Sequence, residues 1–210
     1  MKGQFITIEG QDGAGKSTNL DFIKYYLESK NISVYTTREP GGTKLGEQLR
    51  DILLYGNELK CVDLTELLLM FASRSQHLHE VIYPKLESGT WVVSDRFTDA
   101  TYAYQGAGRG VSIEQIKVLE NLVQKAFRPI LTLVLDIPLD IAKSRGANDD
   151  GDRFEQQQDS FKLRVRNYYL SLCQTRSDRV KCIDASLDIE QVQAQIIEHL
   201  DVLLERVSRK

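Results

Sequence analysis

The stretch EGQDGAGKST, residues 9–18, decides the fold of this chain of 210 residues. Gly10 and residues 15–17 fit the pattern G-x-x-x-x-G-K-[ST], in which backbone N–H groups of a glycine-rich loop bind phosphate oxygens. The apolar run at 5–8 predicts a strand before this loop, and the residues from Ser17 onward predict a helix after it. A strand, a loop and a helix in this order are the setting that the phosphate-binding pattern requires.

The chemistry of this loop predicts a nucleoside triphosphate as its ligand. A phosphate would lie at the N-terminus of the following helix, where unpaired N–H groups and the helix dipole favour an anion. We expect Lys16 to reach the β- and γ-phosphates of ATP and the Ser17 hydroxyl to bind Mg²⁺. The alternative, a glycine-rich turn without a ligand, is disfavoured because spacing, strand and helix all agree. The predicted ATP-binding residues are Gly10, Gln11, Asp12, Gly13, Ala14, Gly15, Lys16, Ser17 and Thr18.

Composition and charge exclude several classes of protein. The chain carries 27 Lys and Arg against 30 Asp and Glu, a net charge of −3, so we expect no general affinity for nucleic acid or for an anionic membrane. Its longest strictly apolar run, at 67–72, is far too short to span a bilayer. The three cysteines are odd in number and form no C-x-x-C pair, which is typical of reduced thiols. We therefore expect a cytoplasmic protein.

Short β-rich runs alternate with helical patterns along the chain. The predicted strands span residues 4–9, 33–38, 91–95, 132–136 and 180–184. Strands that are apolar nearly throughout and alternate with helices indicate a parallel sheet with helices on both faces. We therefore predict an α/β fold of the P-loop NTPase type, with a five-stranded parallel sheet in a single domain over residues 1–210. A glycine- and aspartate-rich stretch at 145–153 is expected to form a short lid loop.

A second motif, VVSDRF at 92–97, ends a predicted strand with a carboxylate and a cation. The C-terminal edge of such a sheet is where α/β proteins bind their ligands. We expect Ser17 and Asp95 to hold Mg²⁺, in the case of Asp95 through water. Arg96 cannot serve the same cation and is better placed to bind a second phosphate group. The alternative is a surface Asp–Arg pair at the strand end.

Two further arginines are candidates for ligand binding. Arg38 in TTREPGGT, residues 36–43, ends the second predicted strand, and the Pro-Gly-Gly turn behind it is tight and open. Arginines at the ends of two strands, Arg38 and Arg96, suggest a bidentate clamp on one phosphate. Arg74 follows a helical apolar run, where it could meet a planar base. A helix-face arginine in water is an equally good interpretation of Arg74.

These motifs together resemble the bacterial thymidylate kinase family. The resemblance runs from about residue 3 to the C-terminus, and two further stretches carry it, AYQGAGRG at 103–110 and RG…DRFE at 145–155. It implies transfer of the ATP γ-phosphate to dTMP, which gives dTDP and ADP on the route to dTTP. It also implies Mg²⁺ as the cofactor and a homodimer as the assembly.

The resemblance gives a role to the carboxylate inside the phosphate loop, which phosphate should repel. In the family this group accepts a hydrogen bond from the sugar 3′-hydroxyl of the acceptor nucleotide and helps to hold a phosphate-binding arginine. Asp12 matches this position. Its charge would be offset by Arg38 and Arg96.

The resemblance also implies the other contacts with dTMP. Arg38 and Arg96 would bind its phosphate, and Arg74 would meet the thymine edge. Relatives commonly have a Phe four residues before this last arginine, where it stacks on the base. Here that position is Met70 and the Phe is Phe71, so either Phe71 stacks on the base or the base packs on a softer side chain. The remaining implied contacts are Thr101 and Gln105 with the base, and Tyr102 or Tyr104 beside the deoxyribose.

An arginine must also meet the charge of the phosphoryl group during transfer. The family supplies it either from the phosphate loop, directly after the carboxylate, or from the lid. Here Gly13 follows the carboxylate, so we expect the lid to supply it, with Gly146 and Gly151 allowing closure. Of the two lid arginines, Arg153 is favoured because it belongs to the DRFE match. The predicted catalytic residues are Asp12, Lys16, Arg145 and Arg153.

Two alternatives remain from the sequence. A different nucleotide kinase of the same architecture would act on another monophosphate. A nucleotide-binding switch would have no acceptor at all, but a GTPase of this kind should carry an N-K-x-D motif, which this chain lacks. For the homodimer, the helical segment at 66–86 is a candidate face, because its apolar residues exceed what one side of a core needs.

Overall fold

The computed structural model describes most of the chain. The described residues are 2–56, 59, 61–145, 153–154 and 156–208. The two ends of the expected lid, Arg145 and Arg153, are among them. Gly146 and Gly151, the glycines expected to allow lid closure, lie outside the described residues.

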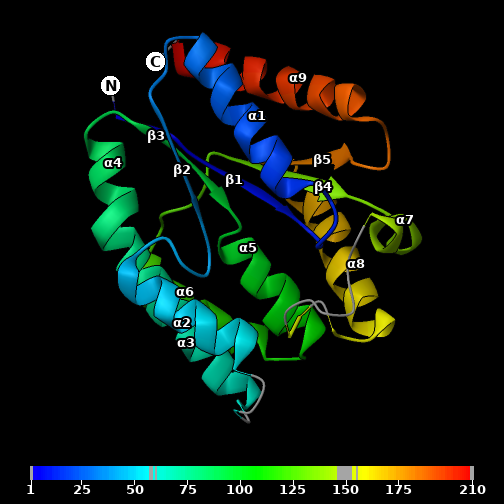
Figure 1. Cartoon of the computed structure of the whole chain (residues 1–210). Helices are drawn as coiled ribbons and strands as arrows, with labels where there is room; N and C mark the ends of the chain where they lie inside the picture. Colours follow the sequence, from blue (N-terminus) through cyan, green and yellow to red (C-terminus); the bar gives the residue numbers. More distant parts are fainter. Residues whose placement is uncertain (1, 57–58, 60, 146–152, 155, 209–210) are drawn as a thin grey trace.

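A five-stranded sheet with the order β2-β3-β1-β4-β5 forms the centre of the fold (Figure 1). All neighbouring strands in it are parallel. The middle strand is β1, in which Ile6 lies opposite Val93 of β3 and Leu131 of β4. The strands are β1 (Phe5–Gly10), β2 (Val34–Arg38), β3 (Trp91–Asp95), β4 (Leu131–Asp136) and β5 (Val180–Asp184). The predicted α/β fold with five parallel strands is confirmed, and each strand ends within one residue of its prediction.

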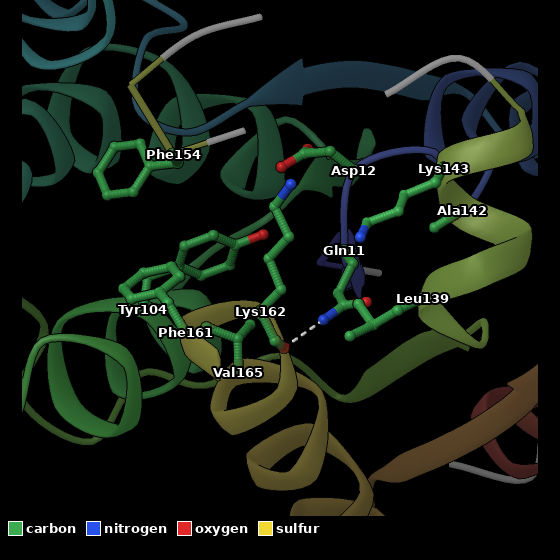
Figure 2. A pocket seen from close by; sticks show the side chains of 10 residues that line it. All are labelled: Gln11, Asp12, Tyr104, Leu139, Ala142, Lys143, Phe154, Phe161, Lys162 and Val165. Carbon is green, nitrogen blue, oxygen red and sulfur yellow. Dashed lines mark hydrogen bonds between the residues drawn. The ribbon is translucent and has the colours of Figure 1, made fainter. Parts of the chain in front are cut away.

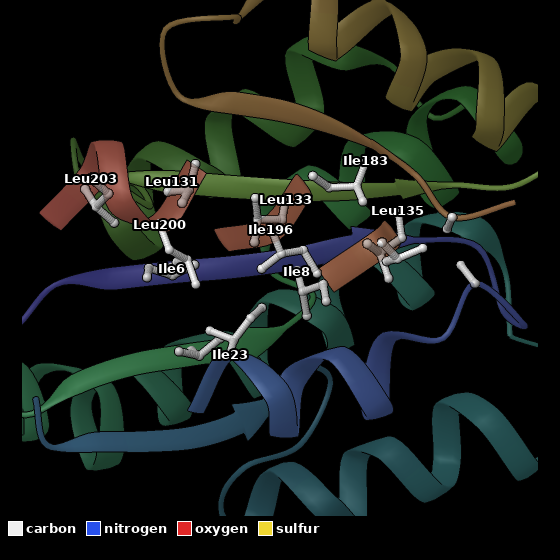
Figure 3. Close-up of a cluster of buried hydrophobic side chains, with 14 of the residues drawn as sticks. Ile6, Ile8, Ile23, Leu131, Leu133, Leu135, Ile183, Ile196, Leu200 and Leu203 are labelled. Carbon is white, nitrogen blue, oxygen red and sulfur yellow. The ribbon is translucent and has the colours of Figure 1, made fainter. Parts of the chain in front are cut away.

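One face of the sheet is covered by α1 (Lys16–Ser29) and α9 (Ile189–Ser208) (Figure 1). Apolar residues recur every three or four positions in both helices, so each helix presents an apolar stripe. Ile23 of α1, Leu200 of α9 and Ile8 of β1 are fully buried in one cluster between these helices and the sheet (Figure 3). Each such side chain contributes about 1.5–3 kcal/mol on burial, and the cluster fixes β1 and the loop that follows it.

The opposite face is covered by α8 (Asp159–Thr175) and by two short segments that follow β3. These are α5 (Thr98–Thr101) and η2 (Tyr102–Gly108), a π-helical segment. Tyr169 of α8 packs there with Val134 of the sheet. The η2 segment contains most of the AYQGAGRG motif. Since π-helical segments are frequent at functional sites, this placement agrees with a functional role for the motif.

Three helices pack together beyond this face: α2 (Lys44–Tyr55), α3 (Asp63–His77) and α6 (Ile113–Gln124) (Figure 1). Thr43 caps the N-terminus of α2: its hydroxyl accepts a hydrogen bond from the N–H of Gly46 at 2.9 Å. The helical segment expected at 66–86 begins three residues earlier in the structure, at Asp63, the first residue of α3. It continues through the π-helical η1 (Leu78–Ile82) into α4 (Tyr83–Glu87). Among the described helices, none has the length and apolarity of a membrane span.

The sheet topology determines where a ligand can bind. Parallel strands end at the same edge of the sheet, so the phosphate loop after β1 lies near the ends of β2 and β3. Arg38 at the end of β2 is opposite Asp95 at the end of β3. The strands that follow β1 are added on both of its sides: β2 and β3 lie on one side, and β4 and β5 lie on the other. The strand order therefore changes direction at β1. Ligands of α/β proteins bind at such a switch point.

Leu133→Ala is expected to lower the free energy of unfolding by about 2–5 kcal/mol, because the truncation leaves a cavity in the core. Leu133 of β4 is fully buried, whereas Leu163 of α8 is 46 % exposed. Leu163→Ala is therefore the matched control, with an expected change within about 0.5 kcal/mol. Urea unfolding at equilibrium measures both values. Equal effects of the two substitutions would contradict the placement of Leu133 in the core.

Candidate active site

The phosphate loop connects β1 to α1 through backbone that only glycine adopts without strain. Gly10 has φ +139°, and a Cβ there would lie 2.5 Å from the backbone oxygen of Leu135 in β4. Gly13 has φ +79°, and its Cβ would lie 2.9 Å from the backbone oxygen of Ala142, which belongs to α7 (Leu139–Ser144). Both glycines therefore allow a close approach of the loop to its neighbours.

Lys16 is held inside this loop. It is the first residue of α1, and its side chain is only 7 % exposed. Its Nζ donates to the backbone oxygen of Gln11 at 2.8 Å and lies 3.4 Å from Oδ1 of Asp12. These contacts fold the amine back over the loop, where it can meet an anion that the loop binds.

Asp12 joins the phosphate loop to the end of β3. Its Oδ1 accepts a hydrogen bond from Nη2 of Arg96 at 2.6 Å. The same Nη2 donates to the hydroxyl of Tyr104 at 2.9 Å. Burial opposes ionisation of Asp12, but the Arg96 and Lys16 cations hold the pKa of this carboxyl well below its usual range. The carboxylate inside the loop is therefore neutralised by two cations.

The backbone at Arg96 is in the left-handed region, with φ +67°, which is uncommon for a residue with a side chain. Hydrogen bonds on both sides hold this conformation. The Ser94 hydroxyl donates to the backbone oxygen of Arg96 at 2.7 Å. The N–H of Phe97 donates to Oε1 of Glu9 at 2.9 Å, and the Tyr169 hydroxyl donates to Oε2 of the same carboxyl at 2.8 Å. Glu9 thus positions the Arg96 segment, although no motif in the sequence indicated it.

Three adjoining cavities surround the Asp12–Arg96 pair. The first cavity is lined by Gln11, Asp12, Tyr104, Leu139, Ala142, Lys143, Phe154, Phe161, Lys162 and Val165 (Figure 2). The second cavity is lined by Asp12, Glu39, Pro40, Arg50, Leu54, Met70, Arg74, Arg96, Phe97, Ala100, Tyr104 and Phe154. The third cavity is lined by Ser17, Leu20, Tyr35, Thr36, Thr37, Arg38, Glu39, Gly42, Glu47, Arg50, Asp95 and Arg96. Neighbouring cavities share lining residues and therefore lie side by side, and we refer to the three together as the cleft.

The third cavity contains three arginines. Arg38, half exposed, is paired with Glu47 of α2 at 2.7 Å. Arg50 of α2 donates from Nη1 to the backbone oxygen of Pro40 at 2.9 Å. Burial, and then the nearby cations Arg38 and Arg96, lower the pKa of Arg50. The same cavity is also lined by the carboxylates Glu39, Glu47 and Asp95. The three guanidinium groups are the part of this lining that can bind an anion.

Arg50 was missed by the sequence analysis. It lies four residues from Gly46 and four from Leu54, two buried residues of α2, so it belongs to the inner face of this helix. A cation on an apolar helix face is the signal that could have indicated it.

Arg74 is not a helix-face arginine in water, because only 2 % of its side chain is exposed. Its Nε donates to Oε2 of Glu39 at 2.7 Å, and its Nη2 donates to the hydroxyl of Thr101 at 3.0 Å. Its Nη1 is buried and has no partner among the described residues. Met70 lines the second cavity beside this guanidinium, whereas Phe71 packs with Leu67 in a separate cluster. Of the two candidates for a base-stacking residue, Met70 faces the cavity.

The two tyrosines of η2 face different surroundings. Tyr104 lines both the first and the second cavity. Tyr102 donates its hydroxyl to Glu120 of α6 at 2.6 Å and lines none of the three cavities. Gln105 is fully buried, and its amide donates to Oε1 of Glu66 at 2.8 Å. Its own carbonyl oxygen has no partner among the residues that the structure describes.

The two lid arginines are bound to other groups. Nη2 of Arg153 pairs with Oε2 of Glu66, a residue that is 1 % exposed. Arg145 donates from Nη1 to the backbone oxygen of Ala185 at 2.7 Å, and its Nη2 lies 3.4 Å from the backbone oxygens of the two following residues. Neither guanidinium lines the three described cavities. Glu66, which holds both Arg153 and Gln105, was also missed by the sequence analysis, because nothing near it in the sequence shows what it contacts.

Ser17 and Asp95, the two residues expected at a metal ion, both line the third cavity. Oδ1 of Asp95 is buried and has no hydrogen-bond partner in the described part of the chain. Oxygen ligands suit Mg²⁺, which keeps several waters when it binds to proteins. The described residues contain no group of three or more His, Cys, Asp or Glu side chains that could hold a metal ion by themselves. The donor set therefore fits a Mg²⁺ ion that arrives with phosphate oxygens.

The chain is similar to thymidylate kinases over nearly its full length. Residues 8–196 match the family model described as thymidylate kinase. Thymidylate kinase of Chromobacterium violaceum is 50 % identical over 206 residues, which are 98 % of this chain and 97 % of the relative. That of Neisseria meningitidis serogroup C is 51 % identical over 202 residues, with 96 % and 98 % covered. The crystal structure of thymidylate kinase from Ehrlichia chaffeensis matches with a TM-score of 0.78 at 32 % identity and covers 96 % of this chain and 99 % of that one.

Glu9→Gln is expected to change how stability depends on pH. Burial, and then the charge of Asp99, raise the pKa of Glu9 from its ordinary 4.5 to about 8. Between these two values the folded chain binds more protons than the unfolded chain, so this group makes the free energy of unfolding fall as pH rises from 4.5 to about 8. Glutamine cannot ionise and should remove this contribution.

Urea unfolding of both chains at several pH values across this window measures the effect. The free energy of unfolding of the variant relative to the parent should increase with pH and level off above the folded pKa. A difference that does not depend on pH would contradict a neutral Glu9 in the folded state.

Proposed function

This chain belongs to the thymidylate kinase family, and we propose that it transfers the γ-phosphoryl group of ATP to dTMP, forming dTDP and ADP in dTTP synthesis. One observation carries the proposal: the ion pair of Asp12 with Arg96 joins the phosphate loop to the third cavity, which three arginines line. A donor phosphate on the loop and an acceptor phosphate on the arginines would face each other across this pair. Phosphoryl transfer needs this alignment and neutralisation of charge.

ATP binds to the phosphate loop in this proposal, with its β- and γ-phosphates on the N-terminus of α1 and on Lys16. The inward position of the Lys16 amine supports this assignment. Ser17 and Asp95 would hold Mg²⁺, and the unpartnered oxygen of Asp95 in the third cavity supports this pair. The ion, when bound, neutralises phosphate charge.

The phosphate of dTMP binds to Arg38, Arg50 and Arg96. Support comes from their common position on the third cavity and from the capacity of guanidinium groups to bind phosphate with two parallel hydrogen bonds. Asp12 accepts a hydrogen bond from the sugar 3′-hydroxyl. Tyr104, rather than Tyr102, lies beside the deoxyribose, because it lines the cavities next to Asp12.

Thymine binds in the second cavity, with Met70 as its packing surface. Arg74 donates from its unpartnered Nη1 to O4 of the base. Cytosine carries an amino group at this position, so two donors would meet and dCMP would be rejected. Thr101 and Gln105 would act on the base through other residues. The Thr101 hydroxyl accepts a hydrogen bond from Arg74, and the Gln105 amide donates to Glu66.

We further propose a single cytoplasmic domain that works as a homodimer. The dimer face lies on α3 and α6, which contact each other. Leu64 and Leu68 of α3 are half exposed, and Val118 and Leu122 of α6 are more exposed still. Exposed apolar side chains on neighbouring helices are typical of an interaction surface.

Lys16→Met is expected to lower kcat for dTMP phosphorylation by about 10²–10³, the cost of losing one preorganised charged donor. Methionine keeps the apolar stem of the side chain, and Arg96 still pairs with Asp12, so the thermal stability should change little. Lys24→Met, a substitution of the same kind two turns further along α1, should leave kcat within a few-fold of the parent. Steady-state kinetics and thermal unfolding measure these effects. Near-normal turnover of Lys16→Met would contradict the assignment of the ATP site.

Arg38→Met and Arg74→Lys are expected to affect specificity in different ways. Loss of a hydrogen bond to a charged group costs about 1.5–3 kcal/mol, so Arg38→Met should weaken dTMP, dUMP and dCMP alike by about 10- to 100-fold. Lysine at 74 keeps a cation beside Glu39 but lacks the planar fork of arginine. Arg74→Lys should therefore weaken dTMP by about 10-fold while affecting dCMP much less.

Thermal-shift titrations of both variants with the three monophosphates measure the affinities. The parent chain provides the reference ratio of dTMP to dCMP. Equal losses for all three nucleotides in Arg74→Lys would contradict a contact between Arg74 and the base.

A further inference from the structure

A phosphoryl group in transfer needs a cation that meets its developing charge. The two lid arginines are engaged elsewhere in this structure, Arg153 with Glu66 and Arg145 with backbone oxygens. Arg96 is paired with Asp12 on the acceptor side. Among the described residues, the cations that line the first cavity beside the phosphate loop are lysines, and neither lid arginine is one of them.

Lys162 of α8 lines this first cavity together with Gln11 and Asp12 of the phosphate loop. Figure 2 shows its side chain extending from α8 into the cavity, with the amine on the side of Asp12. The amine forms no ion pair or hydrogen bond with any residue that the structure describes, while the side chain itself is partly buried. A cation that is available inside the cleft is thus already present beside the loop.

The backbone of Lys162 is fixed to the same loop. The Gln11 side chain donates from Nε2 to the backbone oxygen of Lys162 (Figure 2). On either side of it, Phe161 and Val165 are buried in the cluster between α8 and the sheet. The first turn of α8 therefore has a defined position relative to the phosphate loop, and only the flexible stem of the lysine needs to move.

A second lysine on this cavity serves as a comparison. Lys143 of α7 also lines the first cavity, but its Nζ is paired with Asp159 at 2.7 Å. Its charge is therefore compensated by a carboxylate, and we exclude it from the reacting groups. The hydrogen bond from Lys143 and, more weakly, the charge of Lys162 lower the pKa of Asp159, but Lys162 forms no ion pair with a described residue.

We propose that Lys162 is a catalytic residue whose amine binds the phosphoryl group as it passes from ATP to dTMP. This inference rests on the proposed function. In the step itself, the bond between the γ-phosphorus and the β,γ-bridging oxygen breaks, and its electron pair stays on ADP. A new bond forms from an oxygen of the dTMP phosphate to the same phosphorus. Lys162 transfers no proton; its charge stabilises the equatorial oxygens of the group between donor and acceptor.

Lys162 lies beside the place where donor and acceptor would meet, so we expect its charge to act mainly in the transition state. Asp12 and Tyr104 line both the first and the second cavity, so the first cavity adjoins the place where donor and acceptor meet. A contact made chiefly in the transition state lowers kcat when it is lost and leaves KM nearly unchanged. A contact with bound dTMP alone would raise KM instead.

The test is steady-state kinetics of the full-length chain with ATP, Mg²⁺ and dTMP. Lys162→Met should lower kcat by about 10², with KM for dTMP within a few-fold of the parent. Lys162→Arg should recover a large part of kcat, because it restores the charge. Lys143→Met, the matched control from the same cavity, should keep kcat within a few-fold. Thermal unfolding of each variant checks that the fold is retained.

Several results would overturn the proposal. A kcat for Lys162→Met within a few-fold of the parent would show that the amine is not needed, as would a change in KM alone. Equal losses in Lys162→Met and Lys143→Met would indicate a general effect of positive charge. A larger loss of kcat in Arg153→Ala than in Lys162→Met would assign the role to the lid. Absence of dTMP phosphorylation by the parent chain would overturn the proposed function and, with it, the role of Lys162; a parent that is active beside an active Lys162→Met would overturn the role of Lys162 alone.

Discussion

The ion pair between Asp12 and Arg96 is the interaction on which the site depends. It links the loop after β1 to the end of β3 across 2.6 Å, and all three cavities meet around it. A carboxylate in a phosphate-binding loop would repel its ligand if it stood alone. The pair is partly buried, and removing one partner would leave the other charge without compensation. The pair therefore keeps a negative and a positive group together in the cleft at little net charge.

The same arrangement recurs for two other arginines of the cleft. Three cleft arginines are each held by one carboxylate from a neighbouring segment, in the pairs Asp12–Arg96, Glu47–Arg38 and Glu39–Arg74. Arg50 instead donates to the backbone oxygen of Pro40, and Arg153, outside the three cavities, pairs with Glu66. A guanidinium has five N–H donors, so one carboxylate leaves others available. Carboxylates thus orient the arginines before a ligand arrives, and such preorganisation is a main source of electrostatic stabilisation in enzymes.

Much of the fold was predictable because its signals are local. The strands are continuous apolar runs, and the phosphate loop has fixed spacing, so strand ends and sheet type followed from short windows of sequence. The segments that contain Arg38, Arg74 and Arg96 were also identified from motifs. The positions of Glu9, Arg50 and Glu66 were not, because their partners are between 10 and 160 residues away in the sequence: Arg50 contacts Pro40, and the bond from Tyr169 to Glu9 spans 160 residues. The choice between Met70 and Phe71 likewise depended on which side of α3 faces the cavity.

Turnover of different nucleoside monophosphates shows whether this cleft phosphorylates dTMP. Purified chain would be given ATP and Mg²⁺ with dTMP, dUMP, dCMP or dGMP in turn, and the formation of ADP and of the nucleoside diphosphate would be measured. We expect the highest kcat/KM for dTMP, with dUMP lower and dCMP and dGMP near background. Turnover of another monophosphate in preference to dTMP, or ATP hydrolysis without a phosphorylated acceptor, would contradict it.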